Sequence, residues 1–124
     1  MGEERKSKIS NIVAEKSFRF SIRIVRLSQY LNAEKKEYTL SKQILRSGTA
    51  IGALISEAKY AQSRADFLNK LSIALKEANE TCYWIRLLHE TGYLDDPMHK
   101  SIEKDATELL SLLISITKKL KNNQ

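Results

Sequence analysis

The sequence holds only three residues of the types that most often bind metals or act as activated nucleophiles: His89, His99 and Cys82. Di-iron four-helix proteins place a glutamate three residues before a core-facing histidine. Arg86 occupies that position before His89, and Asp96 occupies it before His99. No histidine lies near Cys82 in the sequence to activate it, so we interpret it as a small buried apolar residue. The sequence therefore predicts no enzyme, no catalytic residue, no metal site and no cofactor.

A row of four cations is the strongest functional pattern. Its members share one helical face at spacings of three and four residues: Lys16, Arg19, Arg23 and Arg26. The row would be about 15 Å long at a rise of 1.5 Å per residue, and could contact several phosphates. The alternative is a solvated face, or pairing with acids of the last helix such as Glu103, Asp105 or Glu108. Three lysines near the C-terminus could extend a cationic surface: Lys118, Lys119 and Lys121.

Composition agrees with an anionic partner without proving one. The chain has 124 residues and a formal net charge of +6, which favours polyanions such as nucleic acid. Its length predicts a single domain spanning residues 1–124. No apolar run approaches the roughly 20 residues of a membrane span, so we expect no membrane contact. One cysteine allows no intrachain disulfide, and we expect a cytoplasmic location.

Apolar residues recur at alternating spacings of three and four, which predicts an all-α protein. In the first helix the core row is Val13, Ser17, Phe20, Ile24, Leu27 and Leu31. A charged arm is expected over 1–9, followed by helices over about 10–33, 39–61, 63–91 and 97–121. Thr39, Ser63 and Asp96 are the expected N-caps of the last three helices. Short loops between long helices predict an up-down-up-down antiparallel four-helix bundle.

The surface of the second helix is unusual, because no face of the helix carries a charged residue from Ser47 to Ser56. Gly48 and Gly52 lie one turn apart, a spacing that allows close approach of helix backbones. That approach could occur within the bundle or between two copies of the chain, and we favour contact between copies. The residues predicted to form this oligomer interface are Leu45, Gly48, Thr49, Gly52, Ala53 and Ser56.

Residues 41–88 also resemble a known family. The matching motifs are Leu45-Arg46-Ser47-Gly48-Thr49-Ala50-Ile51-Gly52, Ile55-Ser56-Glu57-Ala58, Asp66-Phe67, Leu71-Ser72-Ile73-Ala74-Leu75-Lys76-Glu77-Ala78-Asn79-Glu80-Thr81 and Tyr83-Trp84. They resemble the bacterial four-helix-bundle family of 23S rRNA intervening-sequence proteins. That family also includes the accessory variability determinant of diversity-generating retroelements. The resemblance extends over about residues 15–118.

The resemblance implies a ring-like homopentamer with a basic surface and no enzymatic activity. We therefore expect a non-catalytic, oligomeric protein that binds nucleic acid, most simply RNA, through its phosphates. The residues predicted to bind are the four cations of the first helix and the three C-terminal lysines. The alternative is an adaptor that binds a reverse transcriptase and its template RNA in a diversity-generating retroelement.

Overall fold

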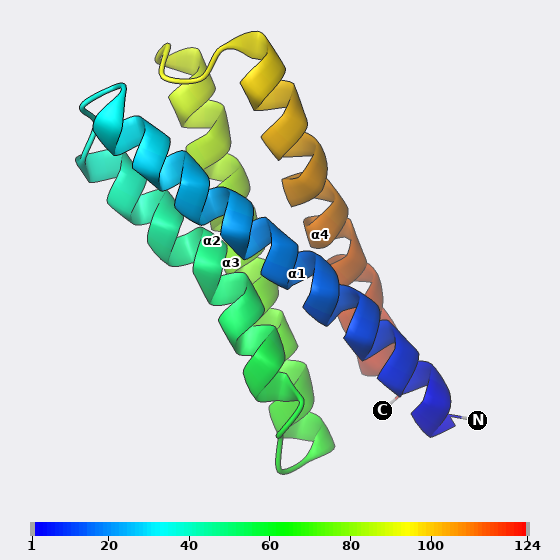
Figure 1. The fold of residues 1–124 in the computed structure, drawn as a ribbon. Helices are drawn as coiled ribbons and strands as arrows, with labels where there is room; N and C mark the ends of the chain where they lie inside the picture. The colour runs from blue at the N-terminus through cyan, green and yellow to red at the C-terminus, as the bar shows by residue number, and fades with distance from the viewer. Residues whose placement is uncertain (1, 124) are drawn as a thin grey trace.

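Four antiparallel helices make up the chain in a computed structural model that describes residues 2–123, with side chains from residue 11 onward. The helices are α1 (Gly2–Ala33), α2 (Thr39–Ala58), α3 (Arg64–Glu90) and α4 (Asp96–Asn122). Consecutive helices run in opposite directions, and both termini lie at the same end of the molecule (Figure 1). Over residues 2–123 there is no strand, which confirms the predicted all-α four-helix architecture. None of the helices described is long and apolar enough to cross a bilayer.

The starts of the first two helices differ from their predictions. Helix α1 begins at Gly2, so the expected charged arm continues the helix instead of preceding it. Residues 2–9 are mostly glutamate, lysine and arginine, which are good helix formers. Thr39 is the first helical residue of α2, and Tyr38 is the N-cap without a side-chain bond. The capping acceptor is supplied by Glu37, whose carboxylate accepts from the Ser41 N–H at 2.9 Å.

The starts of α3 and α4 follow the expected chemistry more closely. The Ser63 hydroxyl accepts from the Asp66 N–H at 3.0 Å, which confirms the predicted cap of α3. The N-cap of α4 is Asp95 and not the predicted Asp96, because the Asp95 carboxylate accepts from the Met98 N–H at 2.9 Å. Two consecutive aspartates made either assignment compatible with the sequence. Pro97 still lies in the first turn of α4, where its missing N–H costs no hydrogen bond.

The core is the row of apolar and small side chains that the heptad spacing predicts. All six residues of the predicted α1 row are buried, including the polar Ser17. Ser47 of α2 and Thr81 of α3 are also fully buried, and the Thr81 hydroxyl donates to the Ser47 hydroxyl at 2.9 Å. That bond satisfies two polar groups inside the core, where unpaired ones would be destabilising.

Helices α1 and α2 approach each other closely at Gly48 and Gly52. A Cβ added at Gly48 would lie 2.8 Å from two side-chain carbons of Ile24. At Gly52 it would lie 3.0 Å from the Ser21 hydroxyl oxygen and 3.3 Å from the Ser17 carbonyl oxygen. Both glycines therefore serve packing within the chain. This corrects the assignment of buried Gly48 to an intersubunit face.

The contact between α1 and α4 is much less extensive than the contacts between consecutive helices. These two helices close the bundle, yet side chains fill the seam between them incompletely. The open seam is the feature that positions the predicted cations, because the row Lys16 to Arg26 lies along its α1 side.

Candidate nucleic-acid interface

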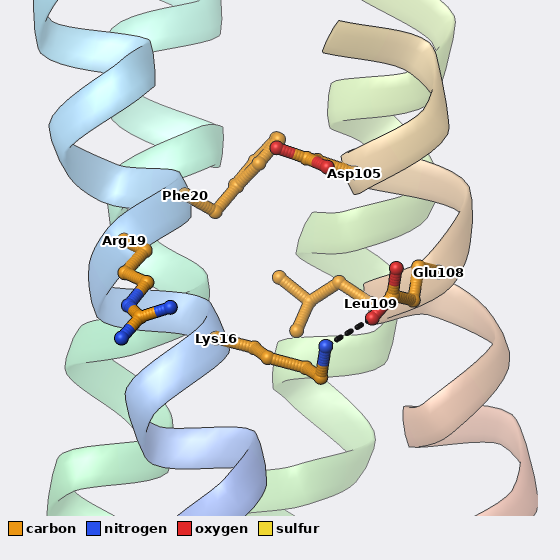
Figure 2. A pocket seen from close by; sticks show the side chains of 6 residues that line it. All are labelled: Lys16, Arg19, Phe20, Asp105, Glu108 and Leu109. Atoms are coloured by element: carbon orange, nitrogen blue, oxygen red, sulfur yellow. Dashed lines mark hydrogen bonds and ion pairs between the residues drawn. The ribbon is translucent and has the colours of Figure 1, made fainter. Parts of the chain in front are cut away.

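The predicted basic row forms one side of a groove between α1 and α4. The lower part of the groove, on the side of the chain termini, is lined from α1 by Lys16, Arg19 and the buried Phe20. Asp105 and Glu108 face them from α4 (Figure 2). In the same view Lys16 reaches across to α4, whereas Arg19 points away from it. The structure thus brings the cations of α1 beside the acids that the sequence offered as alternative partners.

Two of the four cations are engaged by α4. Lys16 forms an ion pair with Glu108 across the groove. The Arg23 guanidinium donates to the Asp105 carboxylate at 2.6 Å, to the Ser101 carbonyl at 3.1 Å and to the Ser101 hydroxyl at 2.8 Å. Arg23 therefore has a structural role, because it joins α1 to α4 in the middle of the groove.

The other two cations stay on the solvent side of α1. The Arg19 side chain is 75% exposed, and among the described side chains it pairs only with Glu15, at 2.9 Å and one turn earlier in its own helix. Arg26 is exposed and has no ion pair with any residue whose side chain the structure describes. Exposed pairs stabilise a protein by only about 0–1 kcal/mol, so a phosphate can replace the carboxylate at little cost. Arg19 and Arg26 are the members of the row most available to a polyanion.

The three C-terminal lysines are exposed on the last turns of α4. The last turns of α4 lie at the same end of the bundle as the start of α1 (Figure 1). Arg64, at the start of α3, donates to the Leu120 carbonyl at 3.1 Å and so holds this end of α4 against α3. The lysines therefore lie on a stretch of α4 that is fixed against α3, about ten residues beyond Glu108 at the end of the groove.

The predicted oligomer interface divides into two parts. Leu45 packs against the core as a half-buried residue. Thr49, Gly52, Ala53 and Ser56 line a groove of about 690 Å³ between α1 and α2, together with Phe18. This groove is open to solvent, so its small residues remain candidates for contact with another chain.

Sequence patterns missed a histidine pair at the turn between α3 and α4. The His89 and His99 rings are stacked, with centroids 3.8 Å apart and planes 4° from parallel. His89 lies 2.7 Å from the Asp96 carboxylate, and this hydrogen bond holds the pKa of Asp96 below its ordinary value. Within the part of the chain that the structure describes, no group of three or more histidine, cysteine, aspartate or glutamate residues could hold a metal ion. No spacing rule could have found the pair, because it depends on the path of the turn.

A second cluster that the sequence did not reveal joins α2 to α3. Arg46 pairs with Glu77 at 2.7 Å and also with Glu80. The Trp84 indole N–H donates to Glu80 at 3.0 Å, and this bond, followed by the Arg46 contact, lowers the pKa of Glu80. Arg46 is thus neutralised by two carboxylates and contributes little free positive charge to the surface.

Cys82 on α3 packs against the apolar core, as expected, but it is half-buried and not fully buried. Burial, and secondarily the charge of Glu103, raise the pKa of its thiol. Since the thiolate is the reactive form, we expect alkylation by iodoacetamide at pH 7.5 to be about tenfold slower in the folded protein than in urea. The measurement is the loss of free thiol with time. Equal rates in the two conditions would show that Cys82 is neither shielded nor raised in pKa.

Comparison with known proteins places the fold in a family. The family model described as 23S rRNA-intervening sequence protein matches residues 10–115. A crystal structure of a protein of unknown function from the S23 ribosomal protein family of Bacteroides thetaiotaomicron is 58% identical and superposes with a TM-score of 0.87. The match covers 89% of this chain and 98% of that one. No curated protein matches the chain. The chain belongs to the 23S rRNA-intervening sequence protein family.

Proposed function

We propose that the protein is a non-catalytic RNA-binding protein that contacts phosphates through the exposed cations of α1 and the C-terminal lysines of α4. One observation carries the proposal: the cations of α1 follow one side of a surface groove, and Arg19 and Arg26 form no ion pair with α4 among the side chains that the structure describes. The net charge of +6 supports the same partner. Binding of this kind is weakly sequence-specific and sensitive to salt.

The charge pattern also explains why binding would involve α1 in particular. Acids and bases balance within α3, and α4 has one more lysine than it has acids. On α1, from residue 11 onward, four cations face a single acid, Glu15. The Arg19–Glu15 pair is exposed and weak, so an RNA phosphate can replace the Glu15 carboxylate at little cost in free energy.

The test is charge reversal at the two available arginines, Arg19→Glu and Arg26→Glu together. We expect retention of a single-stranded RNA on a filter to fall at least about tenfold at 100 mM salt. The slope of the logarithm of the binding constant against the logarithm of salt concentration should become shallower by about one or more. The reason is that binding releases about one counterion fewer for each phosphate contact that is lost. Arg23 is left intact because it joins α1 to α4.

A matched control changes the same charge elsewhere. Lys76→Glu with Arg86→Glu alters two exposed cations of α3 by the same total charge. This control should weaken retention much less than the α1 variant does. If both double variants lose RNA equally, binding follows net charge and the α1 row has no special role. If neither loses RNA, the proposed function is wrong.

We further propose that the chain assembles into a ring-like homo-oligomer, a pentamer by resemblance to its family. Three apolar side chains of α1 support this: Phe18 is 63% exposed, Ile22 38% and Val25 40%. They form a row beside the α1–α2 groove, since Phe18 lines that groove. A contiguous exposed apolar row is typical of a protein contact. At 100° per residue, Arg19 and Arg26 lie directly beside this row, so assembly would repeat them around the ring.

A further inference from the structure

At its upper end, beside the turn between α3 and α4, the groove between α1 and α4 opens into an apolar pocket of about 470 Å³. Its floor consists of Leu27, Leu94 and Ile102, all buried in the core. The half-buried Tyr30 and Met98 form part of its walls. A surface hollow whose lining is apolar to this extent is suited to a flat, apolar group.

The charged side chains that line the pocket are both cations. Arg23 and Arg26 both line the pocket, and no carboxylate does. Arg23 is held by Asp105 and Ser101, so it fixes the boundary between this pocket and the lower groove. Arg26 is exposed and lacks an acidic partner among the side chains that the structure describes. The pocket therefore combines an apolar floor, an aromatic ring and an available guanidinium.

We infer that this pocket binds one unpaired nucleotide, with its base against Tyr30 and Met98 and its phosphate on Arg26. A nucleobase provides the flat, mostly apolar body, and its attached phosphate provides the anion for the guanidinium. Bases within a duplex are stacked and cannot enter a pocket on a protein surface. The site would therefore bind nucleotides of single-stranded regions, loops or bulges and not those of a duplex. The extension to RNA rests on the proposed function, whereas binding of a free nucleotide does not.

The methionines make a direct test possible. The chain has two methionines, Met1 and Met98, so a sample labelled at methionine methyl groups gives at most two signals. Adding adenosine or uridine monophosphate should shift the Met98 methyl signal in a saturable way, and inorganic phosphate alone should not. Arg26→Gln and Tyr30→Leu should each weaken this binding about tenfold. Arg86→Gln removes the same charge from exposed α3 and should leave it unchanged.

A second comparison connects the pocket to RNA. The wild-type protein should retain a single-stranded RNA better than a duplex of equal length, and Tyr30→Leu should reduce that preference while duplex retention persists. Absence of a Met98 shift, or a shift unaffected by Arg26→Gln, overturns the pocket even if RNA is retained. If the shift occurs and no RNA is retained, the pocket binds free nucleotides and the proposed function fails instead. Arg26 is exposed and has no ion pair among the described side chains, so Arg26→Gln should stay folded even if Tyr30→Leu does not.

Discussion

Replacing Gly48 with leucine is expected to lower the free energy of unfolding by about 2–4 kcal/mol. A Cβ at this position would lie 2.8 Å from the Cγ1 and Cγ2 atoms of Ile24, which is itself fully buried. These carbons are close to the Ile24 backbone and cannot move far without displacing α1. The gain in helix propensity over glycine, about 1 kcal/mol, does not offset that overlap. Urea unfolding followed by far-UV circular dichroism measures the change.

Two further variants isolate the cause. Gly48→Ala combined with Ile24→Ala removes the overlapping carbons, so the pair should be more stable than the sum of the single effects predicts. Gly92→Ala is the comparison for a glycine kept by its backbone, because Gly92 has φ of +86° and open space around it. Its cost should be about 1 kcal/mol from strain alone. Wild-type stability of Gly48→Leu would contradict the close approach of α1 and α2.

Helix number, direction and core residues could be predicted because they follow from a local repeat. An apolar residue every three or four positions defines which face of a helix is buried, wherever that helix lies. Ser17 and Ser47 occupy such positions and are buried, although their type alone would not place them inside. Caps were less predictable, because Asp95 and Asp96 are chemically the same and only the backbone path selects Asp95.

The candidate site could be predicted only as far as a single helix determines it. The row from Lys16 to Arg26 was visible from spacing, and so were the acids of α4. Which cation meets which acid depends on how α1 and α4 are rotated and shifted along the bundle. That geometry pairs Arg23 with Asp105 and leaves Arg26 without an ion pair among the described side chains, a distinction that no pattern within α1 contains.

The same limit explains the glycines of α2 and the pocket near Tyr30. The Gly48-to-Gly52 spacing indicated a close helix contact, for which we favoured a second copy of the chain, whereas the close neighbours of both glycines belong to α1 of the same chain. The apolar pocket combines residues of α1 with Leu94 and residues at the start of α4, more than 60 positions later. Its existence depends on incomplete closure of the bundle there, which sequence periodicity does not measure.

Changing Phe18 to aspartate is expected to dissociate the proposed ring into folded monomers. Phe18 is the most exposed side chain of the apolar row on α1, and it is not among the described side chains that form the core or pack against it. Burying an unpaired carboxylate between two copies would cost several kcal/mol, enough to dissociate a contact built on modest apolar surfaces. Light scattering should give the mass of a single 14.2 kDa chain, with the helical circular dichroism spectrum unchanged.

Tyr60→Asp is the matched control for that variant, because Tyr60 is 85% exposed in the turn between α2 and α3 and is not among the residues that line the α1–α2 groove. It should keep the assembled mass. If Phe18→Asp also keeps that mass, the apolar row does not hold the copies together and remains a free surface. If the wild-type protein is itself a monomer, the proposed ring is wrong. In the expected case, loss of assembly should also weaken RNA retention, because Arg19 and Arg26 would no longer be repeated on one particle.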